Sequence, residues 1–297
     1  MYKTIHLQNP DTNLLRYSLE KYGIVLLNYG DEIPIFMKYQ ELMKKYFRLP
    51  NSVKNTHVKP ELSYQIGLTP AYTEIPILSK KPDPKERFMY IVGHQYNIKV
   101  NELKHFESLS KSCGEKYIEL TKFCLKILGS CYNLPKNFFE EKIDQASNIL
   151  ATTCYKYPKK YVKVVAGKHR DVSFITLHIK ATHPGLYLFS RKGKRFPAIV
   201  PKNCILIQAG AQLEYMTSGK ILAGYHEVVA EGCPGETRVA NPFFVHLKGG
   251  VTLETIPTLK SDVRNYPPVK KNEWLFKEIR KISLSSSKFL KSESNIY

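Results

Sequence analysis

From Asn148 onward the sequence breaks into short runs of β-branched, aliphatic and aromatic residues, each followed by turn residues. The runs fall at residues 151–157, 161–165, 173–179, 186–189, 196–200, 205–208, 222–230 and 237–247. Proline and glycine lie between them, as in His183-Pro184-Gly185 and Cys233-Pro234-Gly235, where the backbone turns. Strands this short, repeated about every ten residues, are typical of a sandwich or barrel. The second half of the chain therefore predicts a β core.

Helices are predicted before this core. Asp11 or Thr12 can cap a first helix that Gly23 ends, because Asp and Thr side chains accept hydrogen bonds from free N–H groups and glycine adopts the left-handed turn at a helix end. A second helix follows Pro34, and a long helix covers residues 103–132, where apolar side chains recur at helical spacing.

Three other segments complete the prediction. The apolar run at residues 24–27 is typical of a buried strand. Residues 51–100 are rich in proline and are expected to form loops with two short, exposed strands. Residues 272–282 predict a closing helix, and the tail from residue 283 is rich in serine and lysine.

We predict one structural unit, because 297 residues with 43% hydrophobic side chains suffice for a single large core. A helix-rich region over residues 1–147 is expected to pack on the core. The β core covers residues 148–250, and a helical segment follows over residues 251–283. Residues 284–297 are expected to be flexible. The predicted class is α+β with a mostly β core.

The chain is strongly basic, with 45 Lys plus Arg against 26 Asp plus Glu and a net charge of +19. Such an excess attracts polyanions. The lysines, however, are spread along the whole sequence and form no basic block with interleaved aromatic residues. The charge therefore favours a solvated surface over a nucleic-acid site.

The cysteine pattern and the N-terminal residues help to predict the cellular location of the protein. Six cysteines occur and none forms a CxxC pair, which argues against a zinc ribbon or a thioredoxin-like motif. Residues 1–15 contain no apolar signal-peptide segment, and the run at residues 24–27 is too short to span a bilayer. We therefore expect a cytoplasmic protein with free thiols and no membrane partner.

The candidate metal ligands are His169, Asp171 and His226. His169 and Asp171 are two positions apart, and residues i and i+2 of an extended strand point to the same face. His226 lies in another β-rich run, which can bring it to the same ion. Two neutral imidazoles and one carboxylate leave coordination positions open, as in non-haem Fe(II) oxygen chemistry.

Arg238 is predicted to hold an acidic co-substrate beside this metal. Its own run contains no acidic residue, and a guanidinium meets a carboxylate through two parallel hydrogen bonds. A 2-oxo acid can take two open metal positions and dioxygen the third. Tyr157, in Tyr155-Lys156-Tyr157-Pro158, is placed to add a hydroxyl hydrogen bond.

Each of these residues alone has an ordinary structural explanation. A His-x-Asp triplet occurs by chance in many chains of this length, and a single histidine or arginine on a strand is more often a core or surface residue. Their order and β context together favour a site. The other histidines, at positions 6, 57, 94, 105, 178, 183 and 246, are interpreted as structural or surface residues.

Several segments carry a family resemblance. They are Gly167-Lys168-His169-Arg170-Asp171 with Phe174-Ile175-Thr176-Leu177, Gly210-Ala211-Gln212-Leu213-Glu214 with Thr217-Ser218-Gly219, Tyr225-His226-Glu227-Val228-Val229, Tyr157-Pro158, the strand from Tyr22 to Gly30 and Tyr266-Pro267-Pro268-Val269. Together they resemble the isopenicillin N synthase-like branch of the Fe(II)/2-oxoglutarate oxygenases over most of the chain. The resemblance implies a double-stranded β-helix (jelly roll) flanked by N-terminal and C-terminal helices. It also implies Fe(II) on His169, Asp171 and His226, and 2-oxoglutarate on Arg238 and Tyr157.

Two positions depart from the family pattern. Ala240 stands where the arginine motif of the family has a serine that contacts 2-oxoglutarate, so one hydrogen bond worth about 1 kcal/mol or somewhat more is lost. Ala211 stands where the family usually has Asp. We retain 2-oxoglutarate as the expected co-substrate, contacted near Ala240.

The sequence thus predicts a non-haem Fe(II), 2-oxoglutarate-dependent dioxygenase that oxidises a small organic substrate, with hydroxylation favoured over desaturation or cyclisation. Two alternatives stay open. An oxidase of the same family that uses no 2-oxoglutarate fits the change at Ala240. A catalytically silent binding protein on this fold fits that change and the net charge of +19.

Overall fold

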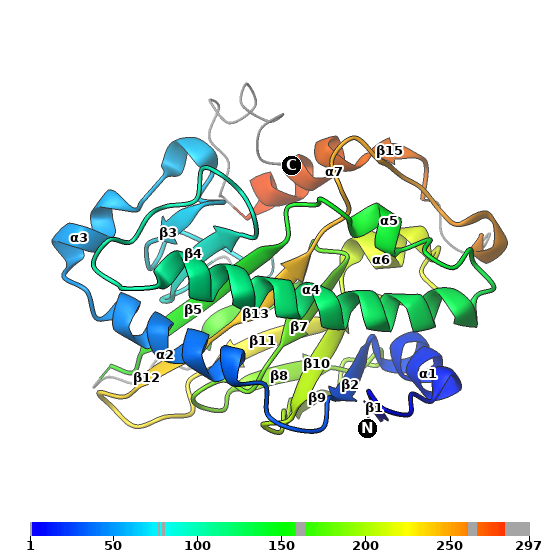
Figure 1. Cartoon of the computed structure of the whole chain (residues 1–297), viewed down its shortest axis with the longest axis horizontal. Helices are drawn as coiled ribbons and strands as arrows, with labels where there is room; N and C mark the ends of the chain where they lie inside the picture. Colours follow the sequence, from blue (N-terminus) through cyan, green and yellow to red (C-terminus); the bar gives the residue numbers. More distant parts are fainter. Residues whose placement is uncertain (1, 77, 79–80, 159–163, 261–265, 283–297) are drawn as a thin grey trace.

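The computed structural model describes the chain except residues 1, 77, 79–80, 159–163, 261–265 and 283–297 (Figure 1). The predicted flexible tail therefore lies outside the described residues. The helices are α1 (Thr12–Tyr22), α2 (Pro34–Phe47), α3 (Asn51–Thr56), α4 (Phe106–Cys131), α5 (Glu140–Ile143), α6 (Ala211–Met216) and α7 (Lys271–Lys281), with short 3-10 turns at Pro60–Leu62 and Pro257–Leu259.

Two β-sheets form the centre of the described part. The larger sheet has nine strands in the order β1-β2-β10-β7-β13-β5-β4-β3, with β12 also paired to β5. These strands are β1 (Thr4–His6), β2 (Ile24–Asn28), β3 (Gly67–Thr69), β4 (Glu86–Ile91), β5 (Ile149–Lys156), β7 (Ile175–His178), β10 (Cys204–Ala209), β12 (Thr237–Ala240) and β13 (Pro242–Val245).

The smaller sheet has four strands in the order β6-β11-β8-β9. They are β6 (Val164–Arg170), β8 (Leu186–Phe189), β9 (Arg195–Pro197) and β11 (Tyr225–Val229), and a separate pair joins β14 (Thr252–Leu253) to β15 (Val269–Lys270). Strands from before residue 148 (β1 to β4) extend the larger sheet at both edges, so the N-terminal region and the β core share one sheet.

The first helix shows how local chemistry sets these elements. The Asp11 carboxylate accepts a hydrogen bond from the Leu14 N–H at 2.9 Å, as expected for an N-cap. Gly23 ends the helix at φ 69° and donates its N–H to the Leu19 carbonyl. The predicted cap and stop are both confirmed, and the chain passes directly into the buried strand β2.

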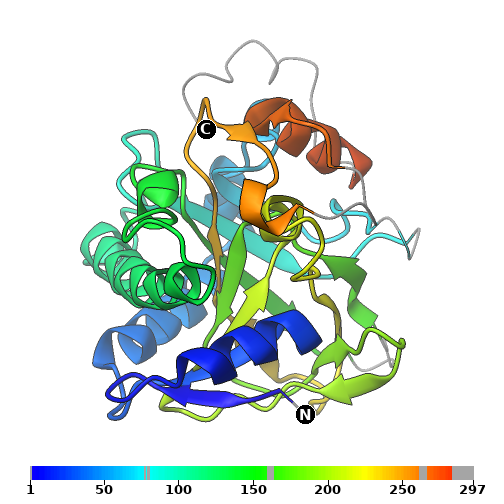
Figure 2. The same cartoon turned by 90° about the vertical axis from the view of Figure 1, so that its right-hand side faces the viewer.

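The larger sheet is covered by helices on one face and by the smaller sheet on the other (Figure 2). On the helical face, Phe243 of β13 stacks on Tyr117 of α4 with ring centroids 4.8 Å apart. On the opposite face, Leu188 of β8 joins a buried cluster with Leu206 of β10. Because successive strand residues point to opposite faces, Phe244 faces the space between the sheets, where it lines a cavity.

Two expectations about strands were wrong. The strands within residues 51–100 are buried rather than exposed, because β4 pairs along its length with β5 and lies between β5 and β3. The run at residues 237–247 forms two strands, β12 and β13, instead of one. The break falls at Asn241-Pro242, and a proline cannot donate a ladder hydrogen bond.

A tight turn fixes the segment that follows β6. The Ala211 N–H donates to the Asp171 carbonyl at 2.9 Å, and the Gln212 N–H donates to the Ser173 carbonyl at 3.1 Å. Gly210 permits this approach, since a Cβ built on it would lie 2.1 Å from the Ser173 carbonyl oxygen. The start of α6 therefore holds the backbone around Asp171 in place.

We expect Gly210→Ala to destabilise the protein by about 1–3 kcal/mol, because the added methyl group forces apart two hydrogen-bonded backbone segments. Urea unfolding followed by circular dichroism measures the change. Gly129→Ala is the matched control, since its Cβ would meet only a ring atom of Phe139 at 3.7 Å. In helix α4 that control should be neutral or stabilising by up to about 1 kcal/mol. Equal stability of the two variants would contradict the steric argument.

Candidate metal centre

His169, Asp171 and His226 meet at one end of the smaller sheet. His169 lies in β6 and Asp171 directly follows that strand. His226 of β11 is the antiparallel register partner of His169, and side chains of paired residues point to the same face. The two imidazole centroids are therefore 4.2 Å apart, and the carboxylate two residues after His169 faces both rings.

The three ligand atoms have the spacing that a shared ion requires. Asp171 Oδ1 lies 3.7 Å from His169 Nε2 and 3.8 Å from His226 Nε2, and all three atoms lie within 4.8 Å of one another. These distances are too long for hydrogen bonds. The two distances from Asp171 are short enough for one ion to lie between the carboxylate and either imidazole at bonds of about 2.1 Å.

The two rings are held by contacts at Nδ1. His169 Nδ1 lies 2.6 Å from the Gly167 carbonyl oxygen. A carbonyl can only accept, so Nδ1 carries a proton and Nε2 faces Asp171. His226 Nδ1 lies 2.7 Å from the side-chain amide of Gln208, a buried residue of β10. The contact of His169 with the Gly167 carbonyl is of the kind that orients metal-binding imidazoles, whereas the Gln208 amide nitrogen donates and fixes the His226 ring.

Burial places the groups in the protonation states that a divalent ion needs. Burial and the neighbouring charge of His169 lower the pKa of His226 to about 3, so its ring is neutral. Burial by itself would raise the pKa of Asp171, but His226, His169 and His178 together lower it below its ordinary value. Asp171 is therefore a carboxylate at neutral pH.

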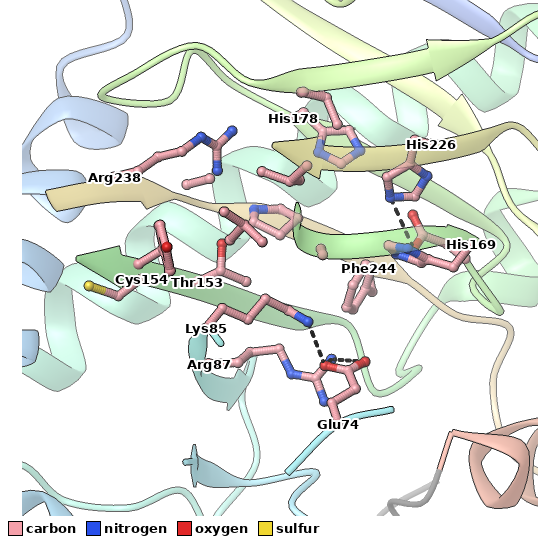
Figure 3. A pocket seen from close by; sticks show the side chains of 18 residues that line it. Glu74, Lys85, Arg87, Thr153, Cys154, His169, His178, His226, Arg238 and Phe244 are labelled. Atoms are coloured by element: carbon pink, nitrogen blue, oxygen red, sulfur yellow. Dashed lines mark hydrogen bonds and ion pairs between the residues drawn. The ribbon is translucent and has the colours of Figure 1, made fainter. Parts of the chain in front are cut away.

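Arg238 lies in a cavity beside these ligands (Figure 3). It belongs to β12, its side chain is buried, and its Nε–H donates to the Pro184 carbonyl at 2.9 Å. Burial lowers its pKa to about 10, which leaves it charged at neutral pH. Within the described part of the chain it forms no ion pair. Ala240 lines the same cavity with a methyl group.

Tyr157, which was predicted to contact the co-substrate, does not line this cavity. Tyr157 lies just beyond the end of β5, and its ring packs on His183, with centroids 5.7 Å apart, and over Gly232. Tyr155 lines the cavity instead, and its buried hydroxyl has no partner among the described residues. The Tyr157 hydroxyl group nevertheless interacts electrostatically with Arg238.

Sequence reasoning also missed His178, which lines the cavity from β7. The available signal was an ionisable residue within the apolar run Ile175-Thr176-Leu177-His178-Ile179. Burying an ionisable residue among apolar side chains costs free energy, so such a residue often has a functional role.

A second missed group is the ion-paired set Glu74, Lys85 and Arg87 (Figure 3). Glu74 Oε2 lies 3.0 Å from Lys85 Nζ and 3.2 Å from Arg87 Nη1. Burial opposes ionisation of Glu74, but Arg87 and Lys85 lower its pKa to about 2. The set lies near a cavity of about 310 Å³ that Glu74, Arg87, His169 and Asp171 all line.

Comparison with known proteins shows which family this part of the sequence resembles. A model described as the 2OG-Fe(II) oxygenase superfamily matches residues 147–247, the span that contains all three candidate ligands and Arg238. Over this span the chain is similar to the 2OG-Fe(II) oxygenase superfamily. It is an oxidoreductase that uses Fe(II), 2-oxoglutarate and dioxygen, and the predicted family, enzyme class and co-substrates are thereby confirmed.

Individual relatives of this oxygenase are distant but cover most of it. The flavonol synthase/flavanone 3-hydroxylase of Arabidopsis thaliana is 21% identical over 94% of this chain and 86% of that protein. The feruloyl CoA ortho-hydroxylase F6H1-1 of Ipomoea batatas is 24% identical over 81% of this chain and 67% of that protein.

Solved structures confirm the predicted double-stranded β-helix. A 2OG-Fe(II) oxygenase family protein from Caulobacter crescentus has a TM-score of 0.84 at 22% identity, covering 94% of this chain and 98% of that one. A full-length Neurospora crassa protein in complex with alpha-KG has a TM-score of 0.79 at 20% identity, covering 93% of this chain and 95% of that one. Among the described residues, no helix is both long enough and apolar enough to cross a membrane.

The contact between Gln208 and His226 can be tested by metal affinity. We expect Gln208→Leu to weaken Fe(II) binding by roughly 10- to 100-fold, because the ring loses the contact that orients it. Anaerobic Fe(II) titration measures the change. Gln40→Leu is the control, since Gln40 is equally buried but donates to the Lys180 carbonyl. If both variants bind Fe(II) like the wild type, Gln208 does not support the ligand.

Proposed function

We propose that His169, Asp171 and His226 hold the Fe(II) of this oxygenase, and that Arg238 binds a carboxylate of 2-oxoglutarate. The observation that carries the proposal is the convergence of two Nε2 atoms and one carboxylate oxygen within 4.8 Å. When bound, Fe(II) supplies the activation of dioxygen, coupled to decarboxylation of 2-oxoglutarate to succinate. The ligand set suits that metal.

The residues of the chain then have separate tasks. Asp171 contributes one negative charge against the two positive charges of the ion. Arg238 fixes the position of the co-substrate through charge-assisted hydrogen bonds, which are strong in a dry cavity. Ala240 provides space near the same carboxylate but no hydrogen bond. The surrounding apolar side chains, among them Val165 and Leu186, exclude water from the reacting groups.

We further propose that the substrate is a small organic molecule, bound in the cavity of about 310 Å³. Its walls come from the segment after β3, from β4 and from α7, and it shares His169 and Asp171 with the cavity that contains Arg238. The co-substrate and the substrate would then occupy the two cavities that share His169 and Asp171. The names of relatives include a flavonol synthase/flavanone 3-hydroxylase and feruloyl CoA ortho-hydroxylases, and the hydroxylases among them support hydroxylation of a small molecule.

Two finer assignments belong to the same proposal. Membership of the isopenicillin N synthase-like branch is supported by the motifs at Gly167–Asp171 and Tyr225–Val229 and by the turn at Gly210. A cytoplasmic location is supported by the six cysteines, all of which are free thiols.

The metal assignment is tested with His226→Ala. Loss of one of three ligands should abolish Fe(II) binding in an anaerobic titration and reduce succinate formation from 2-oxoglutarate to background. His6→Ala, at an exposed position of β1, is the matched control and should behave as the wild type. If His226→Ala formed as much succinate as the wild type, His226 would not be a ligand of the catalytic metal. Product formation by the wild type without 2-oxoglutarate would instead favour an oxidase that does not use it.

The co-substrate assignment is tested with Arg238→Gln. We expect the dissociation constant of 2-oxoglutarate to rise by roughly 10- to 100-fold, because hydrogen bonds to a charged group are lost, while Fe(II) affinity stays unchanged. Anaerobic calorimetry on the Fe(II)-loaded protein measures both. Arg195→Gln is the control, because Arg195 is an exposed residue paired with Glu227. Unchanged 2-oxoglutarate affinity in Arg238→Gln would rule out this contact.

A further inference from the structure

His178 occupies the middle of the cavity between Arg238 and the candidate metal ligands. It is the last residue of β7, a strand that lies between β10 and β13 in the larger sheet. Its ring centroid is 6.0 Å from that of His226. In Figure 3 the ring lies between the guanidinium group of Arg238 and the ring of His226. A ligand that reaches from the metal to Arg238 therefore passes His178.

The His178 ring carries an unsatisfied polar atom beside this cavity. Nε2 of His178 is buried, and it has no hydrogen-bond partner within the described part of the chain. A buried polar group without a partner is unfavourable, and an apolar side chain at the same place would avoid that cost. The position therefore favours a ligand that can form a hydrogen bond with Nε2.

His178 can act as a hydrogen-bond donor beside the buried guanidinium group of Arg238. A neutral imidazole has one N–H. It can donate to an oxygen of an acidic ligand, while Arg238 supplies the positive charge.

His178 also lies beside the position where a family serine is replaced. Pro242 of β13 is the register partner of His178, and Ala240 is two residues before Pro242. Both His178 and Ala240 line the cavity that contains Arg238. The imidazole N–H of His178 in β7 can therefore reach the region in which the methyl group of Ala240 offers no hydrogen bond.

We propose that His178 donates its Nε2–H to an oxygen of bound 2-oxoglutarate and so replaces the hydroxyl group that Ala240 lacks. The inference rests on the proposed function, because it takes the cavity beside Arg238 as the co-substrate site. It makes His178 a specificity-determining contact for the 2-oxo acid, separate from the metal ligands and from the substrate cavity.

The experiment measures 2-oxoglutarate binding by anaerobic calorimetry on the Fe(II)-loaded protein. His178→Leu removes the donor at similar volume and should raise the dissociation constant about tenfold or more. His178→Gln retains an N–H donor and should stay within about threefold of the wild type. Fe(II) affinity should be the same in all forms. His183→Leu is the matched control, since His183 lines neither of the two cavities described above.

A structural role for His178 predicts a different result. In that case His178→Gln would bind 2-oxoglutarate as poorly as His178→Leu, or both would lose Fe(II) affinity, and the proposal would be overturned. In turnover, a co-substrate contact should appear mainly as a higher KM for 2-oxoglutarate, with a smaller change in kcat for succinate.

Introducing a serine at position 240 provides an independent test of the proposal. Ala240→Ser should gain less than about twofold in 2-oxoglutarate affinity in the wild type, but should recover most of the loss in the His178→Leu background, because coupled residues are not additive. A tenfold gain from Ala240→Ser alone would show that the wild type lacks this hydrogen bond and would overturn the proposal. Failure of the wild type to bind 2-oxoglutarate, with Fe(II) affinity intact, would instead refute the co-substrate site itself.

Discussion

The pairing of β6 with β11 is the constraint on which the candidate site depends. It places His226 opposite His169, and the carboxylate that directly follows β6 completes the set. A shift by one residue would turn the His226 side chain to the other face of the sheet. β11 is an inner strand of the smaller sheet, and His226 also pairs with Leu188 of β8. Register shifts occur only past His226, towards Val229.

Burial then gives these groups their chemistry. In the space between the two sheets, His226 and His178 are neutral, whereas Asp171 and Arg238 remain charged. Such a combination attracts a cation at one end of the cavity and an anion at the other. His169 and Asp171 line both this cavity and the larger one beside Glu74 and Arg87. The two cavities therefore both give access to these two candidate ligands.

Sequence patterns were most reliable where a few neighbouring residues decide the outcome. The cap at Asp11 and the stop at Gly23 follow from local hydrogen bonding, and helical spacing indicated the positions of α4 and α7 to within a few residues. The residues between 51 and 100 were predicted less well. Their prolines suggested exposed loops, but β4 is buried by long-range pairing with β5, which no local pattern reports.

The sequence by itself determined the family motifs, the mostly β core and the three candidate ligands, because His169 and Asp171 are two residues apart at the end of one strand and His226 lies in a recognisable run. Only the tertiary structure decided which side chains share the cavity. It brought in Tyr155, His178 and the set of Glu74, Lys85 and Arg87, and it left Tyr157 outside. The physical reason is that strand register and strand ends, set by contacts between residues far apart in the chain, determine where each side chain points.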